Sequence, residues 1–285
     1  FDLWKESDEQ LVDRLISPNG FFARQARQVL HHRAATGTLD SDSVAAKLSA
    51  LFESADSSPF RLNALWTQWC VGALREQDLV RLVKHDDVRV RAWAYHLIGE
   101  SFPLKATGTP AGSMDGVTTA FRPLFDEGLI DASAVGRRYI ASLLQRLPLT
   151  ARWATLQKLS RVGMDSRDRN LPLLVWYALE PLVPQNPSRA YGIVKQTRLP
   201  NLMAFVIRRL SETAAGRDYL VTQLSREPTG AQATMVLEQL SAVATRRGGV
   251  GIPKGWPQAY ESLSQSDNER ARELARSFAV QIGAQ

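Results

Sequence analysis

The sequence predicts an all-α protein, a right-handed αα superhelix in which pairs of helices stack into a solenoid. A segment near the start of the chain recurs further along in register, and no stretch shows the apolar–polar alternation of a run of β-strands. The 285 residues are 44% hydrophobic and 22% charged, which is typical of a globular protein. We expect residues 1–285 to form a single helical-repeat domain.

The internal repeat is the stronger of these two signals. Residues Glu9–Leu30 align with Gln77–Ile98 at a constant offset, which is about twice the ~34 residues of a helix-pair repeat. In both copies a short helix, a polar turn and a longer helix follow each other. This is the pattern of HEAT and armadillo repeats, whose helices bury their apolar stripes by stacking on their neighbours. The aligned apolar residues are Leu11 with Leu79, Val12 with Val80, Leu15 with Val83, Phe22 with Val90, Ala26 with Ala94, and Val29–Leu30 with Leu97–Ile98.

The segment between the two copies supplies the intervening pair, with helices near Val44–Ser54 and Phe60–Leu74. The helix ends carry capping residues. Ser7 is followed by a glutamine three residues later, which is the spacing of a capping box. In the second copy, Asp86 or Asp87 can cap the longer helix. The first part of the chain therefore reads as three stacked helix pairs.

Proline and glycine divide the rest of the chain. Phe102–Gly116 holds two prolines and three glycines and is expected to be a long surface loop, either a functional insertion or a tolerated one. Pro181 is expected to end or kink its helix. Further helices are predicted at Val117–Asp126, Ser133–Gln145, Leu149–Arg161, Leu173–Val183, Pro187–Thr197, Pro200–Ala214, Gly216–Arg226, Gly230–Arg246, Trp256–Ser264 and Asn268–Gly283.

Composition excludes several classes of protein. Lys and Arg outnumber Asp and Glu by 35 to 29, a net charge of +6, and this small excess is a weak signal for nucleic acid. No apolar run reaches the ~20 residues of a membrane helix, so no membrane insertion is expected. The single cysteine, Cys70, excludes an internal disulfide and a multi-cysteine zinc site; we predict a buried, inert thiol. The chain begins at Phe1, as expected of an excised or processed segment.

No catalytic or metal-binding pattern stands out. His31 and His32 are adjacent and cannot face one ligand from one helix surface. His85 and His96 lack the spacing of a helical metal pair. The glycine-rich segment Arg246–Gly255 lacks the spacing of a phosphate-binding loop, so we interpret it as a flexible connection between helices. We predict no metal, no cofactor and no catalytic residue in this segment.

Glu180 is the most unusual charged residue, because it lies within the apolar run Leu173–Leu182. A carboxylate buried among such neighbours needs a partner, since an unpaired buried charge costs several kcal/mol. We expect it to pair with one of Arg137, Arg138 and Arg208 and to lock two repeats together. The alternative is a catalytic acid.

Aromatic and basic side chains leave two interpretations open. The arginines within Ser133–Arg169 are either a solvated surface or the lining of a phosphate-binding face. Core packing is the predicted role for most of the tryptophans on apolar helix faces, which are Trp66, Trp69, Trp93, Trp153 and Trp176.

Several stretches together resemble one family, the membrane-bound dehydrogenases of planctomycetes and their relatives, also called haem-binding Cys-x-x-Cys-His proteins. The resemblance is to their helical-repeat region and spans nearly the whole chain. A generic HEAT repeat would match only the Val-Arg-x-x-Ala portion. The stretches are Ser7–Val12, Val90–Ala94, Leu144–Pro148 with Arg152–Trp153, Asp168–Val183, Arg208–Leu210 and Pro253–Pro257.

The resemblance implies an internal segment of a larger, exported polypeptide. In this family a quinoprotein-dehydrogenase-like β-propeller precedes the region and a c-type cytochrome domain follows it. The haem motif is absent from this chain, so the resemblance assigns no redox chemistry here and places the protein in the periplasm or otherwise outside the cytoplasm. The residues that the resemblance and the burial arguments single out as structural candidates are Trp153, Asp168, Asn170, Trp176, Glu180 and Arg208.

The leading hypothesis is a non-catalytic scaffold or protein-interaction module that spaces or docks the propeller and haem domains, or binds another protein, because solenoids offer extended surfaces. A first alternative is a nucleic-acid-binding HEAT module like the helical-repeat DNA glycosylases, which requires a positive groove. A second is an enzyme whose site lies in the loop Phe102–Gly116 with arginines nearby. Of these partner classes, the sequence favours protein over nucleic acid.

Overall fold

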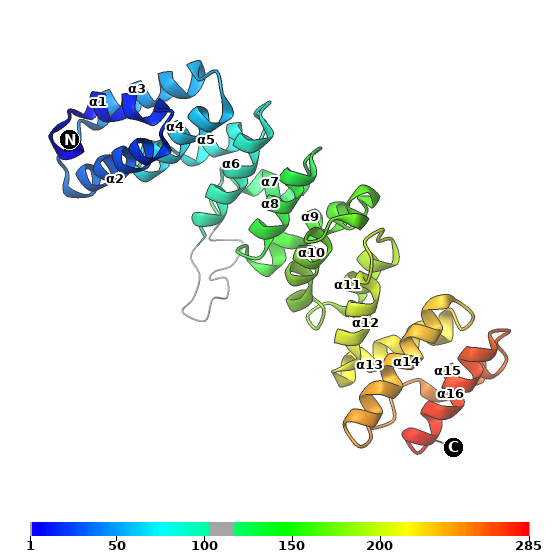
Figure 1. Ribbon diagram of the computed structural model, residues 1–285. Coiled ribbons are helices and arrows are strands. Elements are labelled where there is room, and N and C mark those ends of the chain that lie inside the picture. Colours follow the sequence, from blue (N-terminus) through cyan, green and yellow to red (C-terminus); the bar gives the residue numbers. More distant parts are fainter. Residues whose placement is uncertain (1, 103–116, 285) are drawn as a thin grey trace. The chain divides into compact units, whose positions relative to one another are not determined.

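The protein is described by a computed structural model that covers residues 2–102 and 117–284 (Figure 1). Helices and turns account for these residues, and no β-strand occurs within the described ranges. The predicted all-α solenoid of stacked helix pairs is confirmed. The loop predicted at Phe102–Gly116 lies, except for Phe102, outside the described residues.

Contacts between helices divide the chain into two compact units. Unit 1 is drawn from Phe1–Asp126 and Asp131–Arg146, and unit 2 from Glu127–Ile130 and Leu147–Gln285. The single domain expected from the sequence stays a prediction.

Unit 1 contains two rows of helices. The second helices of successive pairs, α2, α4, α6 and α8, contact one another in turn, and α1 contacts α3 in the other row. Residues aligned in the repeat, such as Leu11 and Leu79 or Ala26 and Ala94, are buried in both copies. The helices are α1 (Asp8–Asp13), α2 (Gly20–Thr36), α3 (Ser41–Ser54), α4 (Ser58–Cys70), α5 (Glu76–Leu82), α6 (Val88–Glu100), α7 (Arg122–Glu127) and α8 (Ala134–Leu144), with 3-10 turns at Leu3–Lys5 and Arg14–Ile16.

Unit 2 repeats the arrangement. Its second helices α10, α12, α14 and α16 contact one another in turn, as do α11, α13 and α15 in the other row. The helices are α9 (Trp153–Leu159), α10 (Leu171–Leu179), α11 (Pro187–Lys195), α12 (Leu202–Ser211), α13 (Ala214–Arg226), α14 (Ala231–Arg246), α15 (Trp256–Ser264) and α16 (Glu269–Gln281), with 3-10 turns at Leu149–Arg152, Gly163–Arg167 and Glu180–Leu182.

The predicted caps are present. Ser7 and Gln10 form the reciprocal capping box at the start of α1. Of the two candidates before α6, Asp87 is the cap, because its Oδ1 accepts the N–H of Arg89 at 2.8 Å. Pro181 ends α10 as predicted, since the chain tightens into a 3-10 turn at Glu180–Leu182.

A recurring arginine ties the start of several helices to the preceding turn. Arg91 Nη1 donates to the carbonyl oxygens of His85 and Asp86 at 2.8 and 2.9 Å. These carbonyls have no helical partner, so the arginine satisfies backbone groups that burial would otherwise penalise. The arginine of the Val-Arg-x-x-Ala pattern is thus structural. The same contact is made by Arg61 to Ala55, Arg137 to Asp131 and Ala132, Arg217 to Ser211, and Arg272 to Ser266.

Asp131 is the centre of a polar network among the described residues of unit 1. Arg91 Nε and Nη2 donate to its two carboxylate oxygens at 2.7 and 3.0 Å. The hydroxyl of Tyr95 donates at 3.2 Å, and the N–H and hydroxyl of Ser133 donate at 2.8 and 3.0 Å. The carboxylate packs so closely on Gly136 that an added Cβ there would lie 2.2 Å from Asp131 Cγ. Burial acts to raise the pKa of Asp131, but these hydrogen bonds outweigh it and lower the pKa to about 2.

Two contacts attach the short segment Glu127–Ile130 to α9 in unit 2. Lys158 Nζ donates to the carbonyl oxygen of Gly128 at 2.9 Å. Gly128 has a φ of +78°, and an added Cβ would lie 2.7 Å from the carbonyl carbon of Ala154. Only glycine allows both this backbone conformation and this approach.

Candidate functional site

The site is built on α10, the helix of the long motif Asp168–Val183. Asp168 Oδ1 accepts the N–H groups of Asn170 and Leu171, both at 2.9 Å, and so caps the first turn of α10. Pro172 follows in the first turn, where proline needs no hydrogen-bond partner. Asp168 therefore has a local structural role, and Asn170 lies exposed at the N-cap position.

A buried arginine fixes the other end of α10. Arg152 donates from Nε and Nη2 to the carbonyl oxygen of Leu147 at 3.1 and 2.9 Å, and from Nη1 to that of Ala178 at 3.1 Å. Its side chain is 2% exposed. Burial lowers the pKa of Arg152 to about 10, so the guanidinium stays charged at neutral pH and clamps α10 to the turn before α9.

With both ends held, α10 presents large side chains to solvent. Leu173 is 41% exposed and Tyr177, one turn further, is 50% exposed. Beside them, the ring of Trp176 on α10 packs against the ring of Phe205 on α12, with centroids 5.3 Å apart, and both rings are partly buried. We name this surface the α10–α12 face, and it consists of Leu173, Trp176, Tyr177, Glu180, Phe205, Arg208 and Arg209.

The burial predicted for Glu180 is wrong. Its side chain is 44% exposed, and its partner is Arg209, with Nε 3.7 Å from Glu180 Oε1. Arg208 is exposed on the same face without an ion pair to Glu180, and Arg137, 3% exposed, is held by backbone carbonyls of its own turn. The reason is that α10 is apolar on all sides, so the sequence does not show which side faces solvent. Glu180 is a surface residue of the α10–α12 face.

Of the five tryptophans predicted to lie mostly in the core, one is buried. Trp153 is 7% exposed, with the Arg189 guanidinium carbon 4.7 Å from its ring centroid. The other four are only partly buried: Trp66, Trp69, Trp93 and Trp176.

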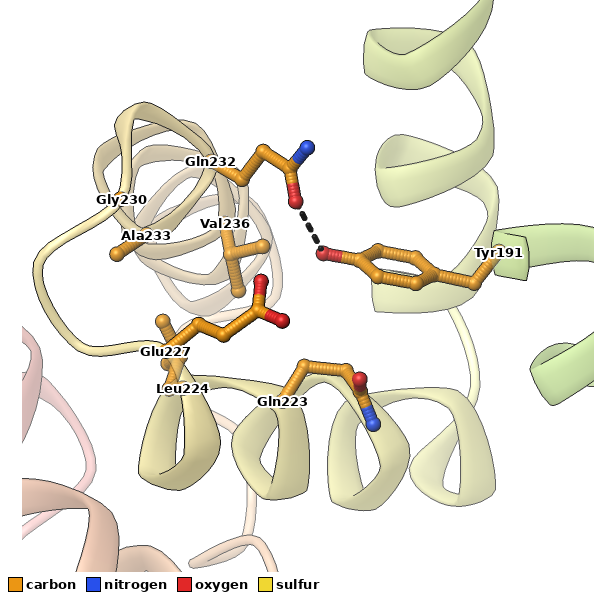
Figure 2. A pocket seen from close by; sticks show the side chains of 8 residues that line it. All are labelled: Tyr191, Gln223, Leu224, Glu227, Gly230, Gln232, Ala233 and Val236. Carbon is orange, nitrogen blue, oxygen red and sulfur yellow. Dashed lines mark hydrogen bonds between the residues drawn. The ribbon is translucent and has the colours of Figure 1, made fainter. Parts of the chain in front are cut away.

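A small pocket of about 210 Å³ lies between α11, α13 and α14 (Figure 2). The Tyr191 hydroxyl donates to Gln232 Oε1 at 3.4 Å. Glu227 pairs with Lys195 at 2.5 Å, and Gln223 lies along the wall in Figure 2. Burial and the nearby Glu227 carboxylate raise the pKa of Tyr191 to about 12. The phenol is therefore neutral at physiological pH, and the pocket is smaller than the roughly 300–1,000 Å³ of typical small-molecule sites.

The described part of the chain contains one cysteine and no cluster of metal-ligating side chains. No group of three or more His, Cys, Asp or Glu side chains there is arranged to hold a metal ion. Cys70 is half-buried rather than buried, and burial raises the pKa of its thiol despite the nearby Arg27. A protonated thiol at neutral pH agrees with the predicted inert cysteine. The enzyme site suggested for the loop 102–116 lies outside the described residues.

Sequence reasoning missed four members of the α10–α12 face: Leu173, Tyr177, Phe205 and Arg209. The signal that was present is the three- and four-residue spacing of Leu173, Trp176 and Glu180, which places them on one stripe of α10. That spacing does not show that the stripe is exposed.

Comparisons with known proteins identify no family. No family model matches the chain, and no curated protein matches it. Among solved structures it is similar to a designed armadillo repeat protein, at 14% identity and a TM-score of 0.23, covering 96% of this chain and 99% of that one. A second engineered protein is similar at 14% identity and a TM-score of 0.24, covering 98% of this chain and 100% of that one. The fold assignment rests on the helix pairs themselves. Among the described helices, none combines the length and apolar character needed to cross a bilayer.

Proposed function

We propose that this chain is a non-catalytic helical-repeat scaffold that binds protein through the α10–α12 face. The observation that carries the proposal is the exposure of Leu173 and Tyr177 one turn apart on a helix anchored at both ends. Large apolar side chains grouped on a rigid surface and rimmed by charge are typical of protein interfaces. Here Glu180 and the two arginines of α12 form that rim.

We further propose that the chain is an internal segment of a larger exported dehydrogenase, and that its partners there are a β-propeller and a c-type cytochrome domain. The support is the resemblance carried by Asp168–Val183. Leu173, Trp176, Tyr177 and Glu180 of the α10–α12 face all belong to that motif. Redox chemistry would belong to the neighbouring domains and not to this scaffold.

Site-specific photo-crosslinking tests the interface. Tyr177 is replaced by p-benzoylphenylalanine in the full-length native protein, and crosslinked peptides are identified by mass spectrometry. We expect crosslinks to peptides of the propeller or cytochrome domain. The matched control carries the same crosslinker at Gln258, an exposed residue of α15. Equal crosslinking from both positions would contradict a specific role for the α10–α12 face.

The intact mass and visible spectrum of the protein isolated from its source test the parent context. A mass well above 31.7 kDa together with a c-type haem band is the expected result. A haem-free product of about this mass would contradict the dehydrogenase context and leave the interaction module standing by itself.

A further inference from the structure

A second surface, on unit 1, has a different character from the α10–α12 face. The Arg27 guanidinium carbon on α2 lies 5.1 Å from the ring centroid of Trp66 on α4. The Trp66 centroid lies 4.9 Å from that of Trp93 on α6, and Tyr139 on α8 follows at 6.4 Å. One side-chain contact thus links each helix of the row to the next. We name this surface the unit 1 stripe, and it consists of Arg24, Arg27, Trp66, Arg89, Trp93, His96 and Tyr139.

The unit 1 stripe carries an excess of positive charge. Arg24 and Arg89 are exposed, and neither forms an ion pair with another of the described residues. Burial lowers the pKa of Arg27, and the positive charge of Arg24 lowers it further, so these two arginines repel each other. The acidic neighbour Glu100 is engaged by Arg146 at 3.5 Å and His96 at 3.7 Å.

In the equivalent row of unit 2, three arginines pair with glutamates. Arg246 and Arg247 on and after α14 both pair with Glu212, which follows α12. Arg270 on α16 pairs with Glu238 on α14 at 3.8 Å.

Two N–H donors within the stripe lack an acceptor. Arg27 Nε and Trp66 Nε1 are both buried without a hydrogen-bond partner, while Arg27 Nη2 donates to Asn63 Oδ1 at 3.0 Å. A buried donor without an acceptor is destabilising, because it loses its hydrogen bond to water and gains none in return. A ligand acceptor that moved the Arg27 guanidinium off the Trp66 ring would give both N–H donors access to a hydrogen-bond partner.

We propose that the unit 1 stripe binds an extended acidic peptide segment of a protein partner. Carboxylates of the segment pair with Arg24 and Arg89, and one carboxylate reaches the Arg27–Trp66 pair. Neighbouring helices lie about 8–10 Å apart, so α2 and α6 are separated by roughly 20 Å. An extended chain rises about 3.3 Å per residue, and about six residues therefore span the two outer arginines. The apolar residues between the carboxylates pack on Trp93.

Ring geometry favours a peptide over single-stranded nucleic acid. The Trp66 and Trp93 rings meet at 70°, and Trp93 and His96 meet at 78°. Base binding uses open, accessible ring faces, whereas here edges are packed on faces and Arg27 covers Trp66. Ring edges are electropositive and suit a carboxylate.

The inference deepens the proposed function by naming a second class of partner, and its test is independent of the α10–α12 face. The probe is a fluorescein-labelled peptide of alternating glutamate and leucine, about twelve residues long so that it exceeds the span of the stripe. Binding to the full chain is measured by fluorescence anisotropy at low salt. A peptide with lysine for glutamate and a labelled oligothymidylate are measured beside it.

The variants are Arg24→Glu with Arg89→Glu, and in milder form Arg24→Gln with Arg89→Gln. All four side-chain changes are at exposed positions, and circular dichroism checks the fold. The matched control, Arg226→Glu with Arg276→Glu, makes the same change of charge at exposed positions of unit 2. We expect the glutamate variant to weaken binding by about tenfold or more, because rim charges set electrostatic complementarity, and the control to bind like the parent.

Three results would overturn the proposal: no binding of the acidic peptide, equal loss in the stripe and control variants, or tighter binding of the oligothymidylate with loss in the stripe variant. If any of these occurs while the Tyr177 crosslinks persist, the unit 1 stripe is refuted and the proposed function stands. If the peptide binds as expected and the crosslinks fail, the α10–α12 face is refuted instead.

Discussion

Replacing Asp131 by asparagine changes one charge in the network that joins α6 to α8. The pKa of Asp131 falls from its ordinary 3.8 to about 2 in the folded protein. One pKa unit corresponds to ~1.4 kcal/mol, so the ionised carboxylate contributes about 2 kcal/mol to the free energy of unfolding. Because the folded-state pKa is the lower one, this contribution is present above pH ~4 and is lost as the pH falls toward ~2.

We expect Asp131→Asn to lower the free energy of unfolding at pH 7 by about 2–4 kcal/mol. The neutral amide cannot form an ion pair with Arg91, and a stranded buried charge costs more than the lost attraction. In the variant Arg91 keeps its hydrogen bonds to the carbonyl oxygens of His85 and Asp86. The loss of stability is therefore smaller than when a buried charge is left with no partner at all. The gap between parent and variant should then narrow as the pH falls from 6 to about 2.5.

Urea unfolding followed by circular dichroism at a series of pH values measures this gap. Asp126→Asn, at an exposed position of α7, is the control and should change stability by less than about 0.5 kcal/mol. A gap between parent and Asp131→Asn that stays constant from pH 6 to about 2.5 would refute the argument. It would mean that the loss comes from packing and not from the charge.

Three further changes can be measured by thermal or urea unfolding. Gly128→Ala should lower the free energy of unfolding by more than about 2 kcal/mol, because the φ of Gly128 is +78° and the added Cβ would lie 2.7 Å from Ala154. An unchanged free energy of unfolding would contradict that geometry. Arg152→Met should cost about 3 kcal/mol because it strands buried carbonyls, including that of Ala178; recovery with lysine would show that charge alone suffices. Glu180→Gln should lower the free energy of unfolding by less than about 1 kcal/mol, as expected of an exposed ion pair. A larger loss of stability would indicate that the Glu180 carboxylate is buried.

The α10–α12 face shows where prediction from sequence stopped. Capping by Asp168 and the end of α10 at Pro181 depend on neighbours a few residues away, and such local interactions are visible in the chain itself. The resemblance singled out the segment that contains α10. It did not separate Leu173 and Tyr177, which face solvent, from Leu171, Val175 and Ala178, which are fully buried.

The same limit applies to charge. The sequence alone suggested three partners for Glu180, and the helix packing supplied a fourth, Arg209, because α10 and α12 lie side by side. The sequence also did not distinguish Arg137 and Arg91 from other basic residues. In the folded protein Arg137 donates to carbonyl oxygens of its own turn, whereas Arg91 also donates to the Asp131 carboxylate.

The amino-acid sequence by itself determined the helices, their caps and the repeat that aligns Glu9–Leu30 with Gln77–Ile98, because hydrophobic period and capping act over a few residues. Tertiary structure alone decided which side of α10 is exposed, which arginines are used in turns, and which are left over on the unit 1 stripe. Those outcomes depend on which helix packs against which, and the atoms that decide them are tens of residues apart in the chain.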